Sequence, residues 1–291
     1  MTENTGALAG LKVIDLSRVL GGPYATQILG DHGAELIKVE PPTGDEVRTW
    51  GPPFKDGAAS YFIGVNRNKR GMSLDFRKEE AKEILFKLLE DADVLIENLK
   101  AGTLEKWGLG YEDELKTRFP KLIYCRLTGF GVDGPLGGLP GYDAAIQAFA
   151  GLMSINGDPQ SGPTKLGTPI VDIGAGMMCL NGILMALYER QKSGLGQCID
   201  VSLFDAGIAM LHPQAPNWFL SGKDPVPMGN GHPNITPYDR FDTANGQIFL
   251  AVGNNKQFKI FCDELGLDGV AEDVRFVNMA DRNTNRPALN E

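Results

Sequence analysis

The feature that most constrains the fold is an alternation of strand-like and helix-like segments through about the first two hundred residues. Short apolar runs that suit buried strands recur there, and helical patterns lie between them. The expected strands are residues 12–16, 35–39, 94–97, 122–127 and 199–202, and the expected helices are residues 23–32, 78–89, 112–119, 143–153, 177–188 and 203–211. This alternation predicts an α/β fold, with a mainly parallel sheet covered by helices on both faces. In such sheets ligands bind beyond the carboxyl ends of the strands.

A change in composition divides the chain. Residues 221–237 are rich in Pro, Gly and Asn, which indicates a linker. We therefore expect residues 1–220 to form a large domain and residues 238–291 to begin a small one. In the small domain two strands, 238–243 and 247–252, flank the hairpin signal Ala-Asn-Gly, and a helix is expected over 256–265. The pattern stops just as a new helix begins, so we expect this domain to be truncated.

Composition excludes several classes of protein. The net charge of −9 argues against broad nucleic-acid binding, which needs a basic surface. The four cysteines are scattered without paired spacing, so neither a metal site nor a disulfide framework is expected. The N-terminus lacks the features of a signal peptide, and the apolar run at 174–187 looks too short and too rich in Gly to span a membrane. We expect a cytoplasmic protein with no membrane partner.

Two aspartates follow glycine-containing motifs and are the strongest candidates for chemistry. They are Asp143, in Gly-Tyr-Asp, and Asp172, in Asp-Ile-Gly-Ala-Gly. Asp172 lies where a turn is expected to open the long apolar helix. Backbone amides and the helix dipole would stabilise a carboxylate there, and so keep it ionised as a nucleophile must be. A plain helix N-cap is the alternative role for this residue.

Three further motifs carry weaker signals. Residues 129–134 match G-x-G-x-x-G, but the Pro- and Gly-rich segment that follows disfavours the helix start that a dinucleotide site requires. The basic run 66–70 suits either a solvated turn or a phosphate contact. The loop 229–233, which contains His232, suits either an ordinary surface loop or part of a site.

Taken together, these motifs resemble the class III CoA-transferase family of the CaiB/BaiF type, which includes formyl-CoA transferase, carnitine CoA-transferase and α-methylacyl-CoA racemase. The matching segments run in the family's order and cover the chain. They are residues 11–16 with 22–23, 36–42 with 44–45, 66–70, 93–98, 129–131, 141–143, 172–177 and 194–197. The resemblance implies a large domain with a Rossmann-like parallel sheet, a smaller α+β domain, and an interlocked homodimer.

The resemblance also implies a reaction. An Asp at the position of Asp172 attacks an acyl-CoA thioester, and CoA then moves to a carboxylic acid through an aspartyl anhydride and an aspartyl-CoA thioester. Coenzyme A enters as a substrate, and no metal is needed. Beside Asp172, Tyr142 and Asp143, the site residues implied by motif position are Arg18, Val19, Lys69, Arg70, Asn98 and Lys106 for CoA, and Gly229, Gly231 and His232 for a mobile active-site loop.

The position of Tyr142 distinguishes two branches of the family. The racemase branch has a His there, which works with the Asp in proton exchange at the α-carbon. A phenol with an ordinary pKa of about 10 is a poor base at neutral pH, so transfer is favoured over racemisation. An acyl-CoA racemase or epimerase, or an inactive truncated family member, are the alternatives. Formyl-CoA transferases have a Gln at the position of Leu20, so oxalate and formate are not favoured as substrates.

Overall fold

The computed structural model describes residues 5–290 and divides into two compact units. The first unit contains residues 5–150 and 167–210, and the second contains residues 151–166 and 211–290. The second unit thus takes in residues 151–166 and 211–220, which we expected in the large domain. These segments join it through their contacts in the fold, which composition does not reveal.

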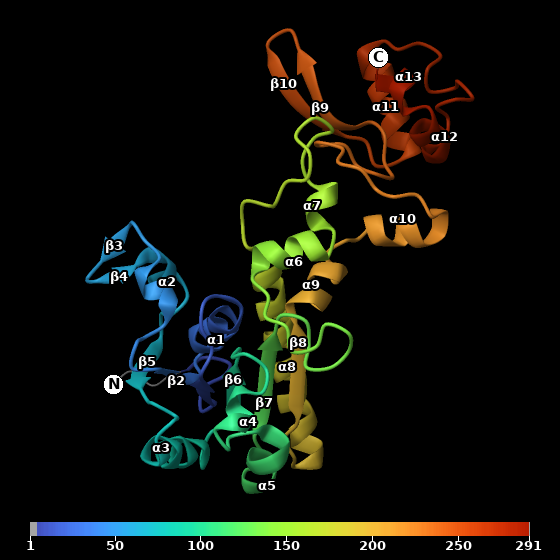
Figure 1. Ribbon diagram of the computed structural model, residues 1–291. Coiled ribbons are helices and arrows are strands. Elements are labelled where there is room, and N and C mark those ends of the chain that lie inside the picture. Colours follow the sequence, from blue (N-terminus) through green and yellow to red (C-terminus); the bar gives the residue numbers. More distant parts are fainter. Residues whose placement is uncertain (1–4, 291) are drawn as a thin grey trace. The chain divides into compact units, whose positions relative to one another are not determined.

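The first unit is built on one six-stranded sheet (Figure 1). Its strands, in spatial order, are β5 (Lys69–Ser73), β2 (Glu35–Glu40), β1 (Lys12–Asp15), β6 (Val94–Glu97), β7 (Ile123–Thr128) and β8 (Cys198–Ser202). Every neighbouring pair is parallel, as the alternation predicts. The strand order reverses between β1 and β6, and the carboxyl ends of strands on either side of such a reversal leave room for a ligand.

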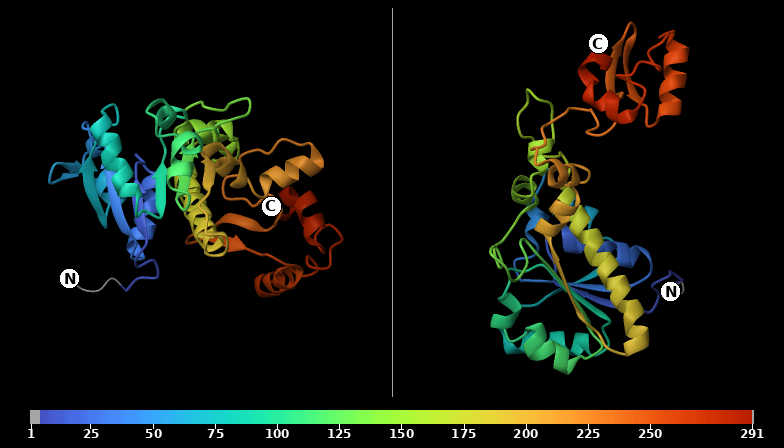
Figure 2. Two further views of the ribbon diagram at one scale, coloured as in Figure 1. Left: turned by 90° about the horizontal axis from the view of Figure 1, so that it is seen from below. Right: turned by 90° about the vertical axis from the view of Figure 1, so that its right-hand side faces the viewer.

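Helices cover both faces of this sheet (Figure 2). On one face, α1 (Gly21–Asp31) packs against α8 (Ile170–Ser193), which also contacts β7 and β8. On the other face lie α3 (Glu79–Leu89), α4 (Thr103–Lys106), the π-turn η2 (Tyr111–Leu115) and α5 (Lys116–Arg118). A core forms under them because alternate strand residues point the same way, and Ile14, Leu95 and Tyr124 pack with Leu85 and Leu115.

The long apolar helix differs from its expected form. Helix α8 has 24 residues and begins at Ile170, seven residues before the expected start at Met177. By length and composition alone it could cross a membrane, and 33% of its most apolar window is buried inside the structure. The expectation that this run is too short for a span is therefore wrong about its length, because the helix extends through the glycines. Within the first unit one side of it packs on α1 and on strands β7 and β8.

The remaining elements of the first unit follow the carboxyl ends of the strands or pack on α8. Between β2 and β5 the chain forms η1 (Glu46–Thr49), the small hairpin of β3 (Phe54–Lys55) and β4 (Ala58–Ala59), and helix α2 (Ser60–Gly64). Helices α6 (Asp143–Phe149) and α9 (Leu203–Ala209) both contact α8. The G-x-G-x-x-G segment is followed by a loop as far as Asp143, so the prediction that no helix starts there is confirmed.

The second unit has its own small core. The antiparallel hairpin of β9 (Tyr238–Thr243) and β10 (Gly246–Ala251) was predicted from Ala-Asn-Gly, and α11 (Asn255–Leu265) follows it. Val252, Phe258, Cys262 and Phe276 pack together beside them. The unit also contains α7 (Leu152–Ile155), α10 (Gln214–Ser221), α12 (Met279–Thr284) and α13 (Arg286–Asn290).

Candidate active site

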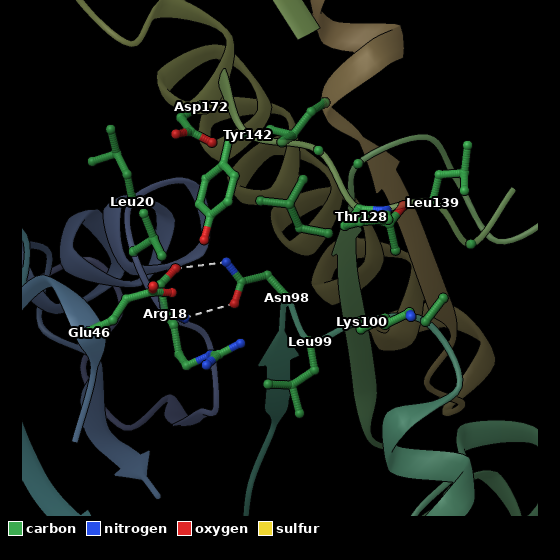
Figure 3. A pocket seen from close by; sticks show the side chains of 18 residues that line it. Arg18, Leu20, Glu46, Asn98, Leu99, Lys100, Thr128, Leu139, Tyr142 and Asp172 are labelled. Atoms are coloured by element: carbon green, nitrogen blue, oxygen red, sulfur yellow. Dashed lines mark hydrogen bonds between the residues drawn. The ribbon is translucent and has the colours of Figure 1, made fainter. Parts of the chain in front are cut away.

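A cavity of about 190 Å³ lies in the first unit at the carboxyl edge of the sheet (Figure 3). The turns after β1 and β6 form one side of it, which places it at the point where the strand order reverses. The end of β7, the loop 138–142 and Asp172 of α8 form most of the rest of the lining, and Glu46 and Leu203 complete it. Figure 3 shows Asp172 and Tyr142 together on one side, with Arg18 and Asn98 across from them.

The carboxylate of Asp172 is partly buried and is not held by hydrogen bonds from the described residues. It lies in the first turn of α8, and no residue between 5 and 290 donates a hydrogen bond to its side chain. Burial raises its pKa to about 7, and the neighbouring charge of Asp143 adds to that rise. This corrects the expectation that backbone amides hold Asp172 ionised as an N-cap would be held.

The capping role belongs to Asp143 instead. Asp143 begins α6 and is buried, and its Oδ1 accepts hydrogen bonds from the backbone N–H groups of Val171 at 2.8 Å and Asp172 at 3.3 Å. Its Oδ2 accepts from Gln147 Nε2 at 2.6 Å. Asp143 therefore satisfies the free amides at the start of α8 and leaves the Asp172 side chain open to the cavity.

Arg18 and Asn98 join the two turns on the opposite side. The Asn98 side chain accepts from the backbone N–H of Arg18 and donates to its carbonyl, both at 2.7 Å. Arg18 Nε is buried without a hydrogen-bond partner among the described residues, so an uncommitted donor remains at the cavity wall. Val19 and Leu20 continue this wall, so three of the residues expected to contact CoA, Arg18, Val19 and Asn98, lie together.

A second cavity, of about 450 Å³, adjoins the first in the same unit. The two share Arg18, Leu99 and Lys100 in their linings. Pro41, Phe76 and Trp107 supply apolar surface, and Arg77 adds an exposed guanidinium, which pairs with Asp75 at 2.8 Å. The first unit therefore has a smaller cavity beside Asp172 and a larger, partly basic cavity next to it.

Three other residues expected at the CoA site lie outside these linings. The Lys69 side chain is 2% exposed and its ammonium pairs with Asp15 at 3.0 Å, while Arg70 is exposed and pairs with Glu35. Lys106 ends α4 and is exposed. The basic run 66–70 thus divides between a buried ion pair and surface ion pairs, and the structure shows no open phosphate contact there.

The residues of the expected mobile loop belong to the second unit. Gly229 has a positive φ of 61° and its backbone N–H bonds to the carbonyl of Gly157. His232 Nδ1 accepts from the backbone N–H of Asn234 at 3.0 Å, and burial, followed by the charge of Arg286, lowers its pKa. Their role at an active site stays a prediction.

Sequence reasoning missed several residues near Asp172. Thr128, Lys100 and Glu46 line the first cavity. Tyr61 of α2 lies close enough to the carboxylates that burial, followed by the charges of Asp172 and Asp143, raises its pKa to about 12. Tyr61 therefore stays a neutral hydroxyl. Thr128 and Glu46 follow directly after an expected strand and a motif segment, and Lys100 follows two residues after one, a signal that could have found them. Tyr61 instead lies in a segment expected to be a loop.

The described residues contain no group of three or more His, Cys, Asp or Glu side chains arranged to hold a metal ion. The ionisable side chains of the cavity, besides the phenol of Tyr142, are two carboxyl groups, Asp172 and Glu46, and two basic groups, Arg18 and Lys100.

Comparison with known proteins agrees with this geometry. The sequence matches the family described as CoA-transferase family III over residues 8–291. It is 45% identical to the succinate–glutarate CoA-transferase of Agrobacterium fabrum, over 95% of this chain and 70% of that protein, and 38% identical to the human succinyl-CoA:glutarate CoA-transferase, over 99% of this chain and 66% of that protein.

Solved structures give the same result. The crystal structure of a CaiB/BaiF family protein from Brucella suis is 46% identical, with a TM-score of 0.82 over 98% of this chain and 76% of that chain. The Rv3272 protein of Mycobacterium tuberculosis is 33% identical, with a TM-score of 0.86 over 98% and 76% of the two chains. By sequence and by fold, the chain belongs to CoA-transferase family III.

Proposed function

We propose that this enzyme moves CoA from an acyl-CoA donor to a carboxylic acid, with Asp172 as the nucleophile. The Asp172 carboxylate attacks the thioester carbonyl and expels CoA thiolate, which leaves a mixed acyl–aspartyl anhydride. The thiolate then attacks the aspartyl carbonyl and releases the donor's acid, leaving an aspartyl-CoA thioester. The acceptor carboxylate attacks this thioester, and the returning thiolate cleaves the new anhydride at its acyl carbonyl, which regenerates Asp172.

The observation that carries this proposal is the open carboxylate of Asp172. It lines a cavity, it accepts no hydrogen bond from the described residues, and burial raises its pKa. A carboxylate kept away from water and from hydrogen-bond donors is poorly stabilised, which favours attack on a carbonyl. Asp143 supports this arrangement because it caps α8 in place of Asp172.

The adjoining cavities support an extended thioester substrate. In our proposal the wider cavity receives the nucleotide end of CoA, where Arg77, Lys100 and the free Nε of Arg18 meet its phosphates. The thioester end then lies in the narrower cavity beside Asp172. Calorimetry should show CoA binding that weakens with salt, and weaker binding of NAD. Equal or tighter binding of NAD would contradict this assignment.

For the acid we propose a short dicarboxylate, with succinate and glutarate tested first. The support is the naming of two relatives, at 45% and 38% identity, as succinate–glutarate and succinyl-CoA:glutarate CoA-transferases. Oxalate is a second candidate, because a relative from Acetobacter aceti that is 41% identical is named acetyl-CoA:oxalate CoA-transferase. Leu20 lines the cavity, and formyl-CoA transferases have a Gln at the matching position. This difference favours the longer acids over oxalate.

The decisive experiment compares variants of Asp172. We expect Asp172→Ala and Asp172→Asn to abolish CoA transfer while the fold is kept. Asp113→Asn is the matched control, because Asp113 is exposed and outside both cavities. Hydroxylamine added after acyl-CoA should modify Asp172 in the unsubstituted protein only.

Two outcomes would contradict the proposal. Transfer that persists in Asp172→Ala would remove Asp172 from the chemistry. Exchange of the α-proton of an acyl-CoA with solvent deuterium, without a covalent adduct, would favour the racemase alternative, which Tyr142 in place of His already disfavours.

A further inference from the structure

The turn between β1 and α1 holds a backbone conformation that its sequence does not favour. Val19 has a φ of 66°, in the left-handed region. A β-branched residue is rarely found there because its side chain crowds the backbone, at a cost of roughly 1–2 kcal/mol. Strain of this kind persists only where surrounding groups enforce it. Val19 also lines the cavity that contains Asp172.

Three side chains from separate elements fix this turn. Lys38 Nζ of β2 donates to the Ser17 carbonyl at 2.7 Å. Asn98, after β6, bonds to both backbone groups of Arg18. Asp45 accepts from the backbone N–H of Val19 at 3.3 Å through Oδ1. Three successive residues, 17 to 19, are therefore each held from outside the turn.

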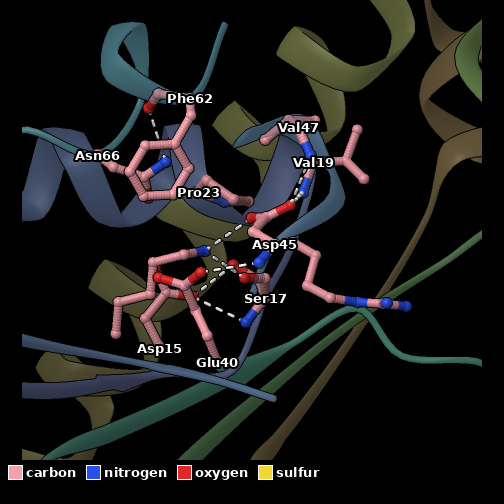
Figure 4. A network of polar contacts seen from close by, with 12 residues as sticks. Asp15, Ser17, Val19, Pro23, Glu40, Asp45, Val47, Phe62 and Asn66 are labelled. Atoms are coloured by element: carbon pink, nitrogen blue, oxygen red, sulfur yellow. Dashed lines mark hydrogen bonds and ion pairs between the residues drawn. The ribbon is translucent and has the colours of Figure 1, made fainter. Parts of the chain in front are cut away.

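Asp45 itself sits in a buried cluster of charges (Figure 4). Its Oδ2 lies 3.1 Å from Lys38 Nζ, as an ion pair without a well-directed hydrogen bond, and these two side chains are 0% and 2% exposed. Its backbone N–H donates to Glu40 at 2.7 Å, and Glu40 in turn pairs with Arg48. Burying these charges has a high desolvation cost, so the cluster is poor evidence of stability and points to a role in geometry.

The end of the turn lies directly against Asp172. A Cβ atom built on Gly21 would stand 3.1 Å from the Asp172 carbonyl oxygen and 3.8 Å from its Oδ1. A shift of the turn would therefore move the cavity wall relative to the Asp172 carboxylate. In reactions of this kind a displacement of about 1 Å can cost on the order of a hundredfold in rate.

We propose that Asp45 is a positioning residue, which together with Asn98 holds the strained turn at Val19 so that an acyl group on the cavity wall faces Asp172. This inference rests on the proposed function. Asp45 acts through the backbone of Val19 and does not line the cavity itself.

The test compares the effect of Asp45→Ala in the unsubstituted protein with its effect in the Val19→Gly variant. Asp45→Ala removes the acceptor for Val19, and we expect kcat to fall about tenfold or more while the Kd for CoA alone changes less than about threefold. Val19→Gly removes the steric cost of the left-handed conformation. In the Val19→Gly background, Asp45→Ala should therefore lower kcat by less than about threefold.

Asp93→Ala is the matched control. Asp93 accepts from the backbone N–H of Lys12 at 2.9 Å and pairs with Arg190, so it resembles Asp45 but lies at the opposite edge of the sheet. We expect its loss to lower the melting temperature with little effect on kcat. If Asp45→Ala and Asp93→Ala have equal effects on kcat, or if Val19→Gly leaves the effect of Asp45→Ala unchanged, the positioning role is wrong.

A second readout does not depend on activity. Hydrogen–deuterium exchange should be faster across residues 16–22 in Asp45→Ala than in the unsubstituted protein, and unchanged there in Asp93→Ala. Unchanged exchange at the turn would also overturn the proposal. Asn98→Ala, which frees Arg18 but leaves the charge cluster intact, gives the same test if Asp45→Ala does not fold. An unsubstituted protein without transferase activity would instead reject the proposed function.

Discussion

The reactivity of the site depends on the surroundings of one carboxylate. Asp172 has no hydrogen-bond donor at its side chain among the described residues, and burial disfavours its charged form. The same burial that makes the ion a better nucleophile reduces the fraction that is ionised near neutral pH. With a pKa of about 7, a large share of the Asp172 carboxyl groups is ionised at neutral pH and able to attack.

We therefore expect transfer to depend on pH through Asp172. In the free enzyme only the ionised carboxylate attacks, so kcat/KM should rise with pH and level off above about 7, the raised pKa of Asp172. A profile from pH 5 to 9 with one acyl-CoA donor measures this. Asp113→Asn should give the same midpoint. A midpoint close to 4, the ordinary value for an aspartate, would show that the Asp172 carboxylate is solvated.

The same titration should appear in stability. Because folding raises the pKa of Asp172 from 3.8 to about 7, ionisation destabilises the folded state as pH rises through this window, and the cost is fully present above pH 7. Asp172→Asn removes that cost. Its melting temperature should exceed that of the unsubstituted protein at pH 8, and the difference should shrink toward pH 4.

At the residue scale, the sequence pointed to three residues that the structure brings to one cavity, but not to the partners of the charges around them. Asp172, Arg18 and Asn98 were found from motifs. The ion pair of Lys69 was not predicted, because its partner, Asp15, lies 54 positions away in the sequence. One signal was present, since Asp15 falls within an apolar central strand, where a carboxylate needs a cation or several donors. Whether Asp15 pairs with Lys38 or with Lys69 depends on the order of the strands in the sheet, which a single sequence does not reveal.

At the element scale, the start of α8 is a composite of two segments. Asp143, the first residue of α6, caps a helix that begins 27 residues later, at Ile170. This arrangement places the Gly-Tyr-Asp motif, residues 141–143, beside the motif that contains Asp172. It also gives Asp143 an electrostatic effect on Asp172, because its charge adds to the rise in the pKa of Asp172.

Two substitutions of Asp143 should separate these roles. Asp143→Asn keeps an oxygen acceptor for the amides of Val171 and Asp172 but removes the charge, so the pH midpoint of kcat/KM should fall. Asp143→Ala should lower the midpoint as well, and should also destabilise the fold by about 1 kcal/mol through loss of the cap. Paired pH profiles and thermal melts measure both effects. Equal stability of the two variants would show that the cap is not important.

The packing of α1 against α8 depends on glycine. A Cβ atom on Gly176 would lie 2.5 Å from the Gly21 carbonyl oxygen, which is backbone and cannot move alone. We expect Gly176→Ala to force the helices apart, to destabilise the fold by roughly 1–3 kcal/mol and to lower kcat, because Gly21 lies next to Asp172. Thermal melts and steady-state assays test this. Gly71→Ala, whose Cβ would meet nothing within 4 Å, should change neither property.

Most elements could be predicted from local pattern, and those that were missed share a physical reason. Strand β5 (KRGMS) is an edge strand with polar and Gly residues, so it lacks the apolar run typical of central strands. Helix α10, for which no element was predicted, follows directly after Pro213 and has Pro216 in its first turn, and two prolines so close together are typical of loops. Helix α8 was expected to begin late because Gly174 and Gly176 suggested a turn, whereas close packing against α1 explains Gly176.

At the scale of the whole molecule, the chain leaves the first unit and returns to it. Residues 151–166 belong with 211–290, although they lie between two segments of the first unit. The composition indicated a boundary near residue 221, but contacts between segments far apart in the sequence decide that residues 151–166 belong to the second unit. The region of the expected linker therefore lies within the second unit, where residues 228 to 231 bond to one another and to Gly157.

Helix α8 carries an exposed apolar surface that bears on how the chain assembles. Met177, Leu184, Met185 and Tyr188 are 46%, 38%, 67% and 62% exposed, and their spacing places them on one face of the helix. An apolar strip of this kind on a helix is typical of a surface that another chain covers. We expect a second copy to cover it, as the homodimer of the family resemblance implies.

Light scattering should then give twice the monomer mass for the unsubstituted protein. Met185→Glu places a charge in the apolar strip, and we expect it to shift the mass toward the monomer, because burying an unpaired carboxylate in an interface is costly. Thr117→Glu adds the same charge to an exposed position of another helix, α5, and should leave the mass unchanged. If both variants keep the mass of the unsubstituted protein, the exposed strip of α8 is not the surface through which the chain assembles.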